Sequence, residues 1–339
     1  MATMALVLLT LFSCKKDTTT VGSELETYNL PGIMMTLSAI SYAESNTSEP
    51  IIRQKIDTLL ADKGLITKGQ WKRVWGPGIS PLNVNLAYVA EYATENQSYY
   101  ALVIRGTRLK SFFDDFEDLN VFEWTHFTYG QADDKVSWGA WDGFNFLLDT
   151  KDSKSGQTLQ TFLNSIPGDS GVRMFVTGHS QGGSLAQVFA YWLKSPSVFN
   201  NKFSVSVLGF AGPSIGNQSF VTNYMNLLSK DESFHMYINS KDVIPRFWSG
   251  IPSIISQDVP VYAPSFYRNL ADSIQLVLAD RGIQYVNMVV ADTIGFIPVK
   301  DTIAGLPATD SVPYYDHWMG VEHHSNNYLR LLGADTIPF

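Results

Sequence analysis

A serine flanked by glycines is the first candidate for chemistry in this chain of 339 residues. The serine is Ser180, in the stretch VTGHSQGGSLAQ that spans Val176–Gln187. A Gly-x-Ser-x-Gly turn between a strand and a helix is typical of a nucleophile, because the glycines permit a turn too tight for a Cβ. The apolar run Val172–Thr177 precedes the turn, and apolar residues follow it at helical spacing: Leu185, Val188, Phe189, Trp192 and Leu193. This context favours a nucleophilic serine over a small residue in a structural glycine-rich loop.

A serine hydroxyl is a poor nucleophile unless a general base takes its proton. Where the turn has this form, the acid and then the histidine follow the serine in sequence. Of the six histidines, those that follow both the serine and a candidate acid are His317, His323 and His324. We expect Ser325 or Asn326 to cap a terminal helix, which would leave the preceding histidine in a loop. His324 is therefore the preferred base and His323 the alternative, with His317 less favoured.

The candidate acid is Asp242, in the stretch YINSKDVIPR. We expect Phe234–Asn239 to form a strand, and the turn after it would present Asp242 at the carboxyl edge of a sheet. Sites in α/β proteins are assembled at this edge. The competing interpretation is an aspartate that hydrogen-bonds its own turn. Position and spacing favour the catalytic role.

Composition excludes several other classes of function. The formal net charge is -8 and no long basic run occurs, which argues against a nucleic-acid partner. A single cysteine rules out a disulfide within the chain. The sequence contains no zinc-ligand spacing, phosphate-binding loop or dinucleotide fingerprint, so we expect neither a metal nor a cofactor.

The N-terminal residues have the pattern of a processed leader. The apolar run Ala5–Phe12 is too short to span a bilayer and has the length of a signal-peptide core. The lone Cys14 follows it at a position that looks like the cleavage site of a bacterial lipoprotein. We therefore predict a signal peptide over residues 1–13, lipidation of Cys14 and a polar tether over 14–28. This would place the protein in the cell envelope, outside the cytoplasm, anchored by lipid to the outer membrane or cell surface; the alternative is a small buried cysteine.

Strand-like and helix-like segments alternate through the rest of the chain. This alternation predicts one α/β domain over residues 29–339, with a mainly parallel sheet and helices on both faces. The expected strands are Ala87–Ala93, Tyr99–Arg105, Val172–Thr177, Phe203–Phe210 and Phe234–Asn239. The expected helices are Leu30–Tyr42, one starting at Glu49-Pro50, and others that include Phe144–Leu148, Leu159–Ile166, Ser184–Leu193, Gln218–Leu228 and Leu270–Ala279.

Together these motifs resemble the class 3 lipases, which have an α/β-hydrolase fold. The segments that carry the resemblance are VTGHSQGGSLAQ, ALVIRGT, GFAGPSIGNQSF, NSKDVIPR and HHSNNYL. The resemblance implies hydrolysis of lipid or small-molecule esters by a Ser-Asp-His triad. It also implies an oxyanion hole formed by the amides of Thr107 and Gln181. Residues 108–136 occupy the place of the family's lid, although their acidic side chains also suit a plain surface loop.

The same triad would serve other reactions. Phospholipase A1, aryl or feruloyl esterase and acyltransferase activities all require it, and no residue in the sequence separates them. A different class of hypothesis is a surface-anchored binding protein that has lost its chemistry. The segment 250–316 is longer than in the fungal members of the class 3 lipase family. We expect it to form a cap or part of the wall that binds the acyl chain.

Overall fold

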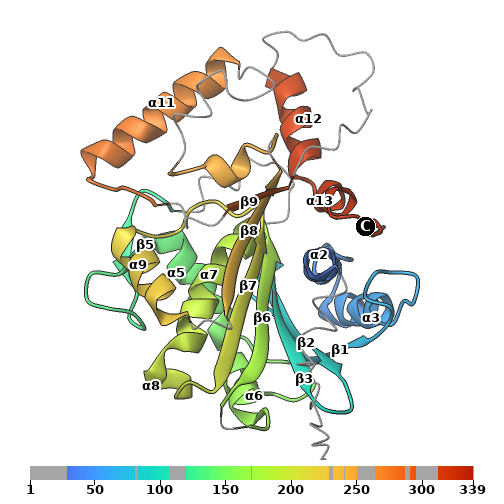
Figure 1. Cartoon of the computed structure of the whole chain (residues 1–339). Coiled ribbons are helices and arrows are strands. Elements are labelled where there is room, and N and C mark those ends of the chain that lie inside the picture. Colours follow the sequence, from blue (N-terminus) through green and yellow to red (C-terminus); the bar gives the residue numbers. More distant parts are fainter. Residues whose placement is uncertain are drawn as a thin grey trace, which may run out of the picture. The chain divides into compact units, whose positions relative to one another are not determined.

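Figure 1 shows a computed structural model of the chain. It describes residues 29–80, 83–106, 120–168, 170–228, 232–239, 241–249, 264–286, 291–294 and 312–338. The chain divides into two compact units, Met1–Leu30 and Pro31–Phe339, and the second contains the sheet and the candidate site. The predictions for residues 1–28, including Cys14, and for Thr107 lie outside the described residues, as do 108–119 of the expected lid.

A mainly parallel sheet forms the centre of the second unit. Among the described residues, seven strands join in the order β1-β2-β3-β6-β7-β8-β9. The first three are antiparallel, and pairing is parallel from β3 onward. Their bounds are β1 Trp71–Ile79, β2 Leu86–Ala93, β3 Ser98–Arg105, β6 Val172–His179, β7 Phe203–Phe210, β8 Ser233–Asn239 and β9 Ala291–Ile294. The predicted sheet type is confirmed.

Helices cover both faces of the sheet, as predicted. Figure 1 shows α5, α7 and α9 on one side of it and α2, α3 and α13 on the other. The bounds are α2 Leu30–Ile40, α3 Glu49–Leu60, α5 Trp138–Asp149, α6 Leu159–Ser165, α7 Gln181–Lys194, α8 Pro196–Phe199, α9 Gln218–Leu227, α11 Ser265–Asp280, α12 Val312–His323 and α13 Ser325–Leu331. A short hairpin joins β4 Trp124–His126 to β5 Lys135–Ser137.

The central helix α7 is buried along nearly its whole length, from Gly182 to Leu193. Its first turn lies so close to β7 that a Cβ on Gly183 would come within 2.7 Å of the backbone oxygen of Phe210. Small residues at the start of α7 therefore let the helix begin directly against the sheet. This contact fixes the position of the turn that joins β6 to α7.

Two apolar clusters stabilise the fold. The larger lies between the sheet and α5, α6, α7 and α9. The second joins α11 and α12 to the residues that follow β8, and its largest side chains include Phe247, Trp248, Tyr267 and Trp318. The described part of the long 250–316 segment thus packs against the end of β8, and Figure 1 shows α11 beyond the carboxyl ends of the strands. A role for this segment in acyl binding stays a prediction.

Candidate active site

Ser180 occupies a strained turn, which we call the elbow, formed by Gly178–Gly182. Its backbone has φ 60° and ψ -132°, a conformation that is costly for a residue with a side chain. The Ser180 N–H donates to the Phe210 carbonyl at 2.9 Å, and the Ser180 carbonyl accepts from the Gly183 N–H at 2.9 Å. A Cβ on Gly182 would lie 2.2 Å from the Ile104 carbonyl oxygen, so only glycine fits there. The sheet and the start of α7 together enforce the turn.

A continuous hydrogen-bonded chain starts at the serine. The Oγ of Ser180 lies 2.8 Å from Nε2 of His323, and Nδ1 of that imidazole lies 2.8 Å from Oδ2 of Asp242. All three side chains are buried, at 8%, 1% and 2% exposure. These residues come from three different elements: the start of α7, the last residue of α12 and the turn after β8. Such an arrangement permits proton transfer from the hydroxyl to an imidazole held by a carboxylate.

The structure places the alternative, His323, beside Ser180 and not the preferred His324. His324 is exposed, and its Nδ1 accepts a hydrogen bond from the Asn326 N–H at 3.1 Å. It is the N-cap of α13, the role that the sequence pattern assigned to Ser325 or Asn326. Because α12 continues through His323, that buried residue lies at the end of a helix, whereas the sequence pattern placed the base in a loop. His317, the third histidine considered, is exposed on α12.

The two carboxylate oxygens of Asp242 make different contacts, each compatible with one of the two interpretations of its turn. Its Oδ1 accepts from the Ile244 N–H at 2.9 Å, as an ordinary turn aspartate does. Its Oδ2 lies against His323 and also accepts from the Tyr328 hydroxyl at 2.7 Å. Burial raises the pKa of Tyr328 well above its ordinary value, and the neighbouring Asp242 adds to this effect. The tyrosine therefore stays protonated and donates to the carboxylate.

A second polar cluster fixes the end of α12 against the end of β8. The Asn239 side chain donates to Glu322 twice, to its backbone oxygen at 3.1 Å and its carboxylate at 2.8 Å. The Asn327 amide donates to the same carboxylate at 3.1 Å. Since Glu322 immediately precedes His323, these bonds hold the imidazole over the elbow. Sequence reasoning did not single out Asn239, although the matched segment NSKDVIPR contains it.

A second histidine, His179, lies beside the first. Its ring centroid is 4.8 Å from that of His323 and 5.4 Å from that of Tyr328. Burial, and then the proximity of His323, lowers the pKa of His179 well below its ordinary value. His179 therefore remains neutral and places no positive charge beside the His323 imidazole.

Two residues were predicted to donate to an oxyanion, and of these Gln181 lies within the described residues. It is the first residue of α7. The partial positive charge of a helix N-terminus stabilises negative charge, so this end of α7 favours an anion beside Ser180. The Gln181 side-chain oxygen lies 3.5 Å from the Asn85 side-chain nitrogen.

Comparison with known proteins shows similarity to lipases. Residues 101–250 match the family model described as Lipase (class 3). The chain is class 3 lipase-like. Over 117 residues it is also 30% identical to the chloroplastic phospholipase A(1) DAD1 of Arabidopsis thaliana, a match that covers 34% of this chain and 23% of the plant protein. The chain thus spans about a quarter of that relative's length.

Solved structures show the fold of this lipase-like chain. The crystal structure of M37 lipase aligns with a TM-score of 0.73 and 22% identity, over 90% of this chain and 93% of that one. Lip2 lipase from Yarrowia lipolytica aligns with a TM-score of 0.49 and 23% identity, over 67% and 78%. The alignment with M37 lipase and the mainly parallel sheet show that the fold is the α/β-hydrolase fold. Together with the family match, it supports a carboxylic ester hydrolase.

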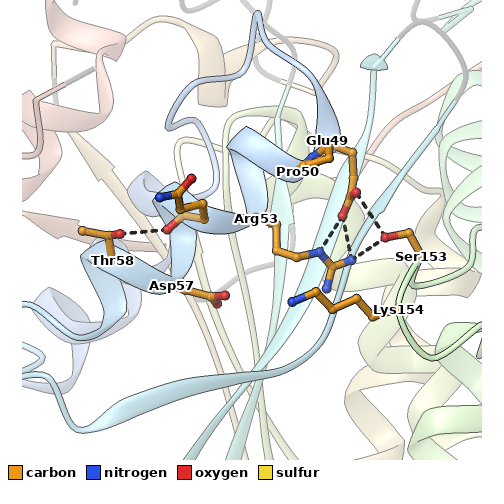
Figure 2. A pocket seen from close by; sticks show the side chains of 8 residues that line it. Glu49, Pro50, Arg53, Asp57, Thr58, Ser153 and Lys154 are labelled. Atoms are coloured by element: carbon orange, nitrogen blue, oxygen red, sulfur yellow. Dashed lines mark hydrogen bonds and ion pairs between the residues drawn. The ribbon is translucent and has the colours of Figure 1, made fainter.

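A polar hollow on the lipase-like chain lies along α3, outside the serine site (Figure 2). Arg53 is buried there and donates to Glu49 at 2.6 Å and to Asp152 at 2.5 Å. Figure 2 shows Lys154 beside this guanidinium and Ser153 within reach of both Arg53 and Glu49. Because two carboxylates already neutralise Arg53, we assign the hollow a structural role: it ties α3 to the segment after α5.

Replacing Arg53 with methionine is expected to destabilise the protein by about 3 kcal/mol, because it leaves buried Asp152 without its partner. Burial acts to raise the pKa of Asp152, but hydrogen bonds from Ser155 and Arg53 outweigh burial and hold it below its ordinary value. A carboxyl of this kind stabilises the fold above its unfolded-state pKa of about 4 and loses that contribution as pH falls through the lower folded-state value. Urea unfolding at neutral and acidic pH should therefore show the deficit of the variant shrinking in acid.

The matched control is Lys154→Met, which removes the same charge from an exposed position in the same hollow. We expect it to change stability by less than about 0.5 kcal/mol. An equal loss in both variants would mean that general charge, rather than the buried ion pair, stabilises this region.

Proposed function

We propose that this protein is a serine hydrolase of acylglycerols or related lipid esters, acting through Ser180, His323 and Asp242. The single observation that carries the proposal is the hydrogen-bonded chain from Ser180 Oγ through the imidazole to the Asp242 carboxylate. The class 3 lipase match and the α/β-hydrolase fold support it.

The reaction follows from the roles of the three side chains. Ser180 Oγ attacks the ester carbonyl carbon while Nε2 of His323 takes the hydroxyl proton. Asp242 holds the proton on Nδ1 and stabilises the imidazolium that forms. The imidazolium then gives its proton to the departing alcohol, which leaves an acyl group on Ser180. Water attacks this acyl-enzyme, loses a proton to the same imidazole and releases the acid.

Backbone amides are proposed to bind the tetrahedral oxyanion. The Gln181 amide begins α7, directly after the nucleophile, and the helix N-terminus favours the negative charge. The Thr107 amide, which lies outside the described residues, is the second proposed donor and rests on the family resemblance alone.

A second candidate function is phospholipase A1 activity, favoured by the match to the plant phospholipase A(1). It requires the same triad and differs only in the ester presented. Aryl or feruloyl ester hydrolysis and acyl transfer also remain compatible with this triad.

Lipid anchoring at Cys14 and a location in the cell envelope stay predictions of the sequence. Among the described residues, no helix combines the length and apolarity that crossing a bilayer would require.

A panel of esters tests the proposal. We expect hydrolysis of p-nitrophenyl esters and of a triacylglycerol emulsion, and covalent labelling of Ser180 by a fluorophosphonate probe. Selective release of the sn-1 fatty acid from phosphatidylcholine vesicles would favour the phospholipase, and preference for feruloyl esters would favour that esterase. Absence of both hydrolysis and labelling would reject the proposal and leave a binding protein with a hydrolase fold.

A further inference from the structure

The Tyr42 hydroxyl joins two strands beside the nucleophile. Tyr42 lies just beyond the end of α2, and its hydroxyl accepts a hydrogen bond from the Gly106 N–H at 3.1 Å. The same hydroxyl donates to the His179 carbonyl oxygen at 3.1 Å and lies 3.3 Å from Nδ1 of that residue. Gly106 follows the last residue of β3, and His179 is the last residue of β6. One side-chain oxygen therefore bridges the carboxyl ends of two neighbouring strands.

This bridge lies where the sheet itself stops. The β3–β6 register ends at the pair Ile104↔Gly178, at the first residue of the elbow. Up to that pair, backbone N–H and C=O groups of the two strands bond directly, as in any parallel ladder. Beyond it, the N–H of Gly106 and the C=O of His179 meet through the Tyr42 hydroxyl. The hydroxyl thus takes the place of one further rung at the point where the strands separate.

The space around the bridge is closed. A Cβ on Gly106 would lie 2.4 Å from the His179 carbonyl oxygen, 2.5 Å from the Tyr42 hydroxyl and 3.0 Å from the Ser180 Cβ. Gly106 is therefore packed directly against the nucleophile's own side chain. A displacement of the end of β3 would therefore shift the Ser180 side chain directly, because no residue lies between them.

The protonation state of the bridge is fixed. Burial raises the pKa of Tyr42, and this outweighs the opposing effects of nearby Arg105 and the hydrogen bond from Gly106. The phenol therefore keeps its proton over the physiological range, donating to one strand and accepting from the other.

We propose that the Tyr42 hydroxyl is a positioning group that closes the sheet between β3 and β6 and holds the backbone around Ser180 in its reactive geometry. This inference rests on the proposed ester hydrolysis. From His179 the chain passes through Ser180 to the Gln181 amide, and from Gly106 it passes to Thr107. A bridge between Gly106 and His179 therefore acts on both sides of the predicted oxyanion hole, although it contacts no substrate.

The expected consequence is a loss in the chemical step rather than in substrate binding. Removing one oxyanion donor costs about 10²–10³ in rate, and a misalignment of about 0.5 Å is enough to weaken such a site. We therefore expect Tyr42→Phe, which deletes only the hydroxyl, to lower kcat by about 10- to 100-fold while KM changes by less than about threefold.

The matched control is Tyr88→Phe. Tyr88 is buried on β2, and its hydroxyl donates to the Leu37 carbonyl of α2 at 2.7 Å. Both variants remove one tyrosine hydroxyl that ties α2 or its end to the sheet, but only Tyr42 touches the elbow. Kinetics on a soluble p-nitrophenyl ester should be combined with hydrogen–deuterium exchange of the Gly106 amide. We expect the Gly106 amide to exchange at least about tenfold faster in Tyr42→Phe than in Tyr88→Phe.

The outcomes separate this inference from the proposed function. Equal kcat in the two variants, or a rise in KM with unchanged kcat, would overturn the positioning role even if the wild-type protein hydrolyses esters. Should the wild-type protein hydrolyse no ester, the proposed function fails by itself. In that case unchanged exchange at Gly106 would overturn the bridge as well, and faster exchange in Tyr42→Phe would support it.

Discussion

Replacing Ser180 with alanine is expected to lower kcat for ester hydrolysis by about 10⁵- to 10⁶-fold, the range seen when a serine nucleophile is removed. The reason is that the attacking oxygen is lost, while the fold keeps every backbone bond of the elbow. Among the side-chain contacts described above, Oγ bonds only to His323. Stability should therefore change little. Steady-state kinetics on a p-nitrophenyl ester, with thermal unfolding measured in parallel, check both expectations.

The matched control for this variant is Ser184→Ala, one turn further along α7. The Ser184 hydroxyl donates to the Pro213 carbonyl at 2.7 Å and takes no part in the chain to His323. We expect it to retain activity within a few-fold of wild type while losing about 1 kcal/mol of stability with that bond. Residual activity above about 1% in Ser180→Ala would contradict the assignment of the nucleophile.

Replacing His323 with alanine is expected to lower kcat by a similar factor, whereas His324→Ala should remain within a few-fold of wild type. Members of a triad act as a unit, so loss of the base leaves the serine almost as inert as loss of its hydroxyl. His324 contributes a helix cap, whose removal costs about 1 kcal/mol of stability. Kinetics and thermal unfolding of both variants distinguish loss of a base from loss of a cap.

The same two histidine variants could also contradict the assignment of His323 as the base. If His324→Ala were inactive and His323→Ala active, the base would have to reach Ser180 through a rearrangement of α12 and α13. Slow fluorophosphonate labelling of His323→Ala, compared with normal labelling of His324→Ala, would show without any substrate that His323 activates Ser180.

Much of the fold could be predicted because its signals are local. The run YYALVIR is apolar enough for a strand buried on both faces, and the strand observed there is Ser98–Arg105. Glycines around Ser180 specified the elbow, since no other residue fits there. β1 escaped prediction because Gly76-Pro77-Gly78 interrupts its pattern, and the β1–β2 register shifts there.

The choice between adjacent histidines could not be made from the sequence. Which histidine faces Ser180 depends on the residue at which α12 ends. The helix ends at His323, and His324 is the N-cap of α13. Capping preferences name Ser, Thr, Asp and Asn, so an imidazole in that role gives no signal. Boundaries of helices are also the least certain part of any pattern-based prediction, and here the proposed base lies on one.

The groups that hold the proposed triad in place were missed for a different reason. Tyr42, Asn239 and Tyr328 act through contacts with residues far away in the sequence, such as the bond from Tyr328 to Asp242. Periodicity and spacing describe neighbours along the chain, and they contain no information about such pairs. Only the assembled sheet shows that one phenol lies between two strand ends.

The order of elements along the chain has a consequence for biosynthesis. Ser180 and Asp242 are translated before α12, and every described strand of the sheet precedes that helix. A nascent chain can thus complete its sheet while it carries a nucleophile with no base. On the proposed mechanism, such a chain is inactive until α12, which ends in His323, packs against the end of β8 and Glu322 accepts a hydrogen bond from Asn239. On that mechanism, catalytic competence requires the segment that ends in His323, which is translated after every described strand of the sheet.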